Sequence, residues 1–181
     1  MCICIFVYLD NKGGTVSYAA LGSIPGDLLY PVKIKIVEPV ADVFVFSDIA
    51  KVEREAEKAI LRLEEAEELA TKEKLDSKSR TELEKQFDKN LENFDRKVRS
   101  VENSSEKEAE DLKASFESSL NDHAESLKKT GAEIEKRRDD EDESEASLFG
   151  KKVIEKATRR KEIESREREE KNNNKKSEDV R

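Results

Sequence analysis

Residues 24–40 read IPGDLLYPVKIKIVEPV, and this stretch decides how the rest of the chain is interpreted. Pro25 and Gly26 form a turn signal, and Asp27 is a candidate N-cap for a helix that follows the turn. Pro31 falls in the first turn of that helix, where a missing backbone N–H removes at most one intrahelical hydrogen bond. The stretch therefore predicts a turn followed directly by a helix.

The second half of the stretch is compatible with two local structures. Residues 32–36 alternate as a half-buried strand does, and Val and Ile favour strands. A lone strand has no partner here unless residues 3–8 supply one. We therefore expect short helical pieces, and we expect Pro39 to end or kink any helix that passes through Glu38.

The seven residues from the turn to the second proline are assigned to one structural motif. We expect Leu28, Leu29 and Tyr30 to cover the end of a helical hairpin made by residues 49–74 and 79–102. The motif comprises Pro25, Gly26, Asp27, Leu28, Leu29, Tyr30 and Pro31.

The composition favours long helices over a thick globular core. Of the 181 residues, 43% are charged and 35% are hydrophobic, whereas an ordinary domain has about 25% and 45–50%. Helices in a hairpin or coiled coil need only one apolar stripe each. A largely disordered chain is the alternative, but the apolar residues are regularly spaced. We therefore predict an all-α fold, either an antiparallel helical hairpin or an elongated coiled-coil-like bundle.

Two apolar stripes recur at helical spacing. The first predicts a helix from about residue 49 to Lys74, capped by Ser47 or Asp48, and Asp76 with Ser77 makes a plausible turn and cap before the next helix. Its stripe consists of Ile49, Val52, Ala56, Ile60, Leu63, Ala66 and Leu69. The second stripe consists of Leu83, Phe87, Leu91, Phe94, Val98, Val101, Ala109, Leu112, Phe116, Leu120, Leu127 and Ile134.

The second stripe belongs either to one helix over residues 79–135 or to two helices that meet near Ser105. Ser105 and Glu108 fit a capping box, which would start a second helix. Two helices would let the second half fold back onto the first. A continuous rod would leave its stripe exposed unless another chain covered it. The sequence leaves both alternatives open.

The last part of the chain loses the stripe and becomes mostly charged. We expect a polar loop or frayed helix end over residues 137–145, a final helix capped by Ser147, and disorder in the last ten or so residues. The expected organisation is an apolar segment (1–23), a helical domain (24–102), an amphipathic helical extension (103–138), and a charged helix with a disordered tail (139–181).

Nine residues at the start of the chain carry no charge. Residues 1–9, MCICIFVYL, are too few to span a bilayer, which takes about 20 apolar residues. They lack the basic start of a complete signal peptide and resemble the end of an anchor whose beginning is missing. The alternative to a truncated membrane anchor is a frayed apolar tail or a strand. Membrane contact through this segment is one expectation.

No pattern in the sequence indicates a catalytic, metal or cofactor site. Cys2 and Cys4 have no second Cys pair or nearby His, and His123 is the single histidine. No phosphate-binding loop or nucleophile elbow occurs. Residues 151–181 hold twelve basic and eight acidic residues, so the remainder of this −8 chain carries −12, which disfavours nucleic acid as a ligand. We expect no enzyme activity, no cofactor and no metal.

One family shares the opening motif. Ser17-Tyr18-Ala19-Ala20 followed by IPGDLLYPVK at residues 24–33 resembles the start of bacterial domain of unknown function 5667, and RLEEA at residues 62–66 resembles its second signature. The resemblance covers about residues 17–100. It implies an all-helical domain just outside a membrane anchor, with some relatives similar to membrane-bound anti-sigma factors. No catalytic residues are known for the family. This chain departs from the pattern by lacking a full anchor before Tyr18.

These observations give two expectations for function. The first is a non-enzymatic helical domain at the extracytoplasmic face of a bacterial membrane, acting through protein contact or as a spacer. The alternative is a soluble, cytoplasmic coiled-coil scaffold that self-associates through the stripe from Leu83 to Ile134. An enzyme is the least supported interpretation.

Overall fold

The computed structural model describes residues 20–138 and 142–178, with side chains to residue 170. The apolar segment 1–9, and with it a strand over residues 3–8, lies outside this range. The described residues contain helices and no strand, which confirms the all-α prediction. The elements are α2 (Tyr30–Val32), the π-helical turn η1 (Lys33–Val37), α3 (Glu38–Val43), α4 (Asp48–Thr71), α5 (Ser77–Glu102), α6 (Glu106–Arg138) and α7 (Glu145–Glu178).

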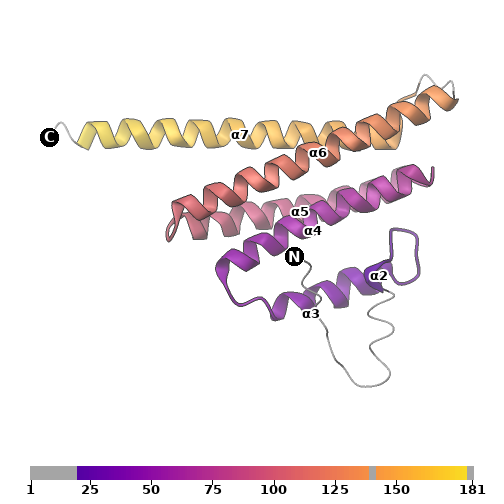
Figure 1. Cartoon of the computed structure of the whole chain (residues 1–181), viewed down its shortest axis with the longest axis horizontal. Helices are drawn as coiled ribbons and strands as arrows, with labels where there is room; N and C mark the ends of the chain where they lie inside the picture. The colour runs from indigo at the N-terminus through magenta and orange to yellow at the C-terminus, as the bar shows by residue number, and fades with distance from the viewer. Residues whose placement is uncertain (1–19, 139–141, 179–181) are drawn as a thin grey trace.

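Helices α4 to α7 form a bundle of two antiparallel hairpins (Figure 1). The first hairpin pairs α4 with α5, and the second pairs α6 with α7. The two hairpins pack against each other most closely between α4 and α6. Helix α7 is 34 residues long, and its C-terminal end extends past the ends of the other helices.

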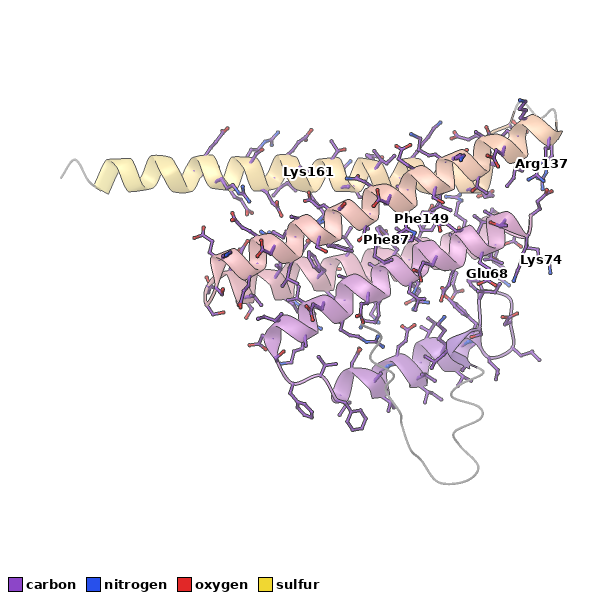
Figure 2. All side chains as sticks on the ribbon, viewed as in Figure 1. Glu68, Lys74, Phe87, Arg137, Phe149 and Lys161 are labelled. Atoms are coloured by element: carbon purple, nitrogen blue, oxygen red, sulfur yellow. The ribbon has the colours of Figure 1, made fainter. Side chains whose placement is uncertain are left out.

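The predicted stripes form the core of this bundle. The second stripe is buried at every position except Leu112, which packs against the core from its edge. Between α5 and α7, the rings of Phe87 and Phe149 meet edge to face with centroids 6.1 Å apart, and both lie in the interior (Figure 2). One contiguous apolar cluster runs from α4 to α7. Residues 103–138 contain α6, one of the four bundle helices, and its buried residues belong to the same apolar cluster as those of α4 and α5.

Residues 79–135 form two helices and not one, because the helix ends between α5 and α6. Helix α5 ends at Glu102, and α6 begins at Glu106 and returns along the first hairpin. Folding back covers the second stripe with side chains of the same chain.

Side-chain caps explain where the bundle helices begin. Ser47 accepts a hydrogen bond from Ala50 N at 3.1 Å, and Asp76 accepts one from Ser79 N at 2.7 Å, as expected. The expected cap of the last helix is wrong by one turn, because Ser144, and not Ser147, accepts from the backbone at the start of α7. Helix α7 also continues to Glu178, beyond the point where we expected order to end. Residues 159–171, which precede this end, are mostly Glu, Lys and Arg, and these favour helices even without a stripe to bury.

The helical run through Glu38 does not end at Pro39, but its regular α-helical geometry is interrupted directly before Glu38 and a new α-helix, α3, begins there. Residues 30–43 form one helical run in which the π-helical turn η1 immediately precedes Glu38 and Pro39. A proline clashes with the carbonyl four residues earlier in a regular α-helix. The wider π turn relieves that requirement, so Pro39 sits in the first turn of α3.

Candidate interaction site

Residues 20–46 form a covering segment that lies along the outer side of α4 (Figure 1). Its first feature is a tight turn over residues 24–27. Ile24 N donates to Asp27 Oδ2 at 3.0 Å, and Asp27 N donates to Ile24 O at 3.0 Å. Gly26 has a φ of 99°, a conformation that side chains disfavour. Asp27 thus closes the turn, and the expectation that it caps the helix is wrong.

Contrary to expectation, the three residues after the turn do not jointly cover the end of the helical hairpin. Leu28 is 96% exposed, so its expected place in the cover is wrong, and Leu29 is only half-buried. Tyr30, the first residue of α2, is buried against α4, and Pro31 faces solvent. Of the three residues expected to form the cover, only Tyr30 is buried, so they do not form a hydrophobic plug.

The face of the covering segment that meets α4 is charged. Lys33, which is buried, donates from Nζ to Glu65 Oε1 at 2.6 Å and to Ser23 O at 3.0 Å. Glu38, also buried, pairs with Arg62 Nη2. A buried charge requires a partner because the protein interior solvates it poorly. The segment is therefore held to the bundle by oppositely charged groups.

Arg62 lies at the centre of these contacts and is fully buried. Its Nη1 donates to both oxygens of Glu65 at 2.8 Å and to Tyr30 Oη at 3.2 Å. Tyr30 Oη in turn donates to Glu65 Oε2 at 3.1 Å. We call Tyr30, Lys33, Glu38, Arg62 and Glu65 the buried ion cluster; it has two cations and two anions and is neutral overall.

The cluster shifts the pKa of two of its members. Burial, assisted by the negative charge of Glu65, raises the pKa of Tyr30 well above its ordinary value. Burial acts to lower the pKa of Arg62, but attraction to Glu65 and Glu38 outweighs it and leaves that pKa raised. Both shifts favour the neutral phenol and the charged guanidinium that the hydrogen bonds require.

A second polar cluster fixes the end of the covering segment. Lys58 Nζ lies 2.8 Å from Asp42 and 3.0 Å from Glu55. Glu55 also accepts from Lys97 of α5 at 2.6 Å. Burial acts to raise the pKa of Glu55, but the hydrogen bonds from Lys97 and Lys58 outweigh it and lower that pKa. This cluster links α3, α4 and α5.

The opposite, outward face of the covering segment is apolar. Seven of the eight large apolar side chains that are exposed in the described residues lie here, and the eighth is Ile163 on α7. Val43 is 70% exposed, and Phe44 and Phe46, in the link to α4, are 56% and 82% exposed. The seven are Leu21, Leu28, Ile36, Val40, Val43, Phe44 and Phe46.

The covering segment is therefore amphipathic, but its charged face meets the bundle and its apolar face meets solvent. An ordinary surface helix buries its apolar stripe and exposes its charges. Here Lys33 and Glu38 point inward, while Ile36 and Val40 point outward. Clustered apolar groups on a surface mark a contact with a protein or membrane, so this outward apolar face is the candidate site.

The prediction based on the sequence motif did not include the charged residues of α4 that hold the covering segment in place. A signal was nevertheless present, since Glu55, Lys58, Arg62 and Glu65 recur at steps of three and four along one edge of the α4 stripe. Charges at that period indicate a helix face laced with ion pairs, which by itself is as typical of a solvent-exposed face. In the structure the covering segment supplies Lys33, Glu38 and Asp42 as partners to this face.

Other features of the described residues do not add a chemical site. No group of three or more His, Cys, Asp or Glu residues there is placed to hold a metal ion. His123 is half-buried at the edge of the bundle, with Nδ1 3.0 Å from Glu67 Oε1. Within residues 20–138 and 142–178, no helix combines the length and the apolar character needed to cross a bilayer.

A comparison of the chain with protein-family models, with curated proteins and with solved structures finds no match. The resemblance to the uncharacterised bacterial domain stays a prediction.

Proposed function

We propose that this chain is a non-enzymatic helical domain that works by contact at the extracytoplasmic face of a membrane. In this proposal, the α4–α7 bundle is a rigid spacer, and the covering segment carries the contact surface. The resemblance of residues 17–33 supports the location.

The observation that carries the proposal is the concentration of exposed apolar side chains in one segment. In a chain that is 43% charged, seven of the eight exposed large apolar side chains of the described residues fall within residues 20–46. Scattered apolar residues need no explanation, but their concentration in one short segment does. The charged inner face leaves this group free for a partner.

The dimensions of the bundle support a spacer role. Helix α7 has 34 residues, which corresponds to about 51 Å at 1.5 Å per residue. Its exposed residues are bound to one another and to the bundle by ion pairs such as Arg159–Glu155, at 2.7 Å. Helix α7 packs into the bundle through Phe149 and Val153, but its described residues after Ala157 bury no side chain. A polar helix that projects in this way can hold a distance between two contacts.

A scaffold that self-associates through the stripe from Leu83 to Ile134 is the second expectation. The burial of that stripe within one chain counts against it. Sedimentation equilibrium of the full chain tests it, since concentration-dependent mass would favour self-association.

Cell fractionation tests the proposed contact function. The full chain is produced with Phe44 and Phe46 both replaced by Ser, and Ile163→Ser serves as the matched control because Ile163 is exposed on α7. We expect the unchanged chain and the control in the membrane fraction and the double variant largely in the soluble fraction. Protease added to intact spheroplasts should digest the protein. Recovery of the unchanged chain in the soluble fraction would overturn the proposal.

A further inference from the structure

We infer that the partner of the outward apolar face is the lipid bilayer itself, and specifically a zwitterionic lipid surface. This inference rests on the proposed function and names the partner of the same site. Three observations carry it: the shape of the apolar face, its charge, and its position in the chain.

The shape of the face suits a fluid partner. Phe44 and Phe46 lie in the link between α3 and α4, and each residue is more than half exposed. A protein partner packs against an interface core with close shape complementarity. Acyl chains adapt to protruding rings, so insertion needs no matching pocket. Aromatic and aliphatic side chains on one face are what interfacial helices bury at the boundary between headgroups and acyl chains.

The charge of the face suits a zwitterionic surface and not an anionic one. Only Asp27 and Lys35 are exposed charges within the covering segment. Helices that bind anionic lipids carry several Lys or Arg residues beside their apolar face, and the single exposed one in this segment is Lys35. The chain as a whole carries −8, so anionic headgroups would repel it.

In the amino-acid sequence, the covering segment follows closely after another uncharged stretch. Residues 1–9 contain no charged residue, and they precede the covering segment by only a short connection. Figure 1 shows α2 and α3 on one side of the bundle and α7 on the opposite side. A bilayer under the covering segment would therefore leave the charged helix α7 directed away from the lipid.

Sedimentation with phosphatidylcholine vesicles tests the inference directly. The full chain should bind these vesicles, and the double variant Phe44→Ser, Phe46→Ser should bind at least about tenfold more weakly, a difference of about 1.4 kcal/mol. Ile163→Ser should bind as the unchanged chain does. Replacing part of the lipid with phosphatidylglycerol should weaken binding at low salt. Circular dichroism verifies that each variant is folded.

Several outcomes separate failure of this inference from failure of the proposed function. If the chain binds membranes of the producing cell but not phosphatidylcholine, and protease treatment of those membranes abolishes binding, the partner is a protein and only the lipid inference fails. If it binds neither, both fail. A dimer that the double variant abolishes, without vesicle binding, would assign the face to a second copy. Vesicle binding that is lost on deletion of residues 1–19 but not in the double variant would overturn the inference.

Discussion

Arg62 and Glu38 pair across the boundary between the bundle and the covering segment, 24 residues apart in the chain. The guanidinium of Arg62 is fully buried, and Glu38 is nearly so. The pair stands where a hydrophobic contact is usual between a helix and the bundle it covers. A charged inner face and an apolar outer face are therefore two aspects of the same arrangement.

The first prediction concerns the centre of the buried ion cluster. Arg62→Met removes the cation that bonds Glu65 and Glu38 and leaves two buried carboxylates with Lys33 alone. Removing one partner of a buried pair costs about 3–5 kcal/mol of unfolding free energy. Urea unfolding followed by circular dichroism measures this loss.

The matched control for Arg62→Met is a substitution in an exposed ion pair at the C-terminal end of the same helix, α4. Lys72 Nζ lies 2.5 Å from Glu68, and both side chains are about half exposed; Figure 2 shows Glu68 at the end of α4. Lys72→Met should change the unfolding free energy by less than about 0.5 kcal/mol. Equal effects of the two substitutions would contradict a buried cluster.

The second prediction concerns the pH dependence of stability through Tyr30. Its pKa is raised above the ordinary value of 10.0 by burial and by the negative charge of Glu65. The folded state therefore keeps the phenolic proton at a pH where the unfolded chain releases it. The stabilisation is fully present below pH 10 and is lost as the pH rises above that value.

Tyr30→Phe isolates this contribution. The variant should be less stable than the unchanged chain by about 1 kcal/mol at pH 8, because it loses the hydroxyl hydrogen bonds. The difference should shrink as the pH rises above 10, since only the unchanged chain carries the titrating phenol. Thermal unfolding of both proteins from pH 8 to 11 measures it, and a constant difference across that range would contradict the assignment.

The third prediction concerns the close approach of α6 and α7. A Cβ added at Gly150 would lie 2.7 Å from the backbone oxygen of Ala124. Alanine favours a helix over glycine by about 1 kcal/mol, but the clash is with backbone and forces the two helices apart. Gly150→Ala should therefore lower stability by about 1–3 kcal/mol. Gly22→Ala is the control, because no atom lies within 4 Å of its added Cβ; a more stable Gly150→Ala protein would contradict the packing.

The fourth prediction concerns the start of α5. Asp76 accepts a hydrogen bond from Ser79 N, and this bond lowers the pKa of Asp76 below 3.8. Asp76→Ala should cost about 1 kcal/mol, whereas Asp76→Asn should retain most of the cap. The difference between the unchanged chain and Asp76→Ala should fall as the pH drops through the lowered pKa, because protonation weakens the acceptor. Urea unfolding at pH 7 and pH 3 measures both effects.

The bundle followed from periodicity because each stripe has one obvious place to be buried. The residues from Leu83 to Ile134 keep the helical period, and their burial needs only a turn, which the Asn103–Ser105 stretch provides. The caps at Ser47 and Asp76 followed from local chemistry. These features depend on short-range rules that a single sequence displays.

The candidate site depended on long-range pairing that no local rule displays. Lys33 and Glu65 are 32 residues apart, and an alternating run of Lys and Ile is equally compatible with strand or helix. We expected apolar residues of the motif to face inward, so Leu28 was assigned to the core. The ion cluster reverses that assignment, because pairing of the charges fixes which face of the segment meets α4.

Unfolding free energies of two substitutions on opposite faces of the covering segment test the reversed orientation most directly. Lys33→Met replaces a buried cation with an apolar side chain of similar length, and Val43→Lys places a charge on the outward face. The account predicts a loss of about 3 kcal/mol for Lys33→Met and a change within about 0.5 kcal/mol for Val43→Lys. A stable Lys33→Met protein together with a strongly destabilised Val43→Lys protein would contradict it.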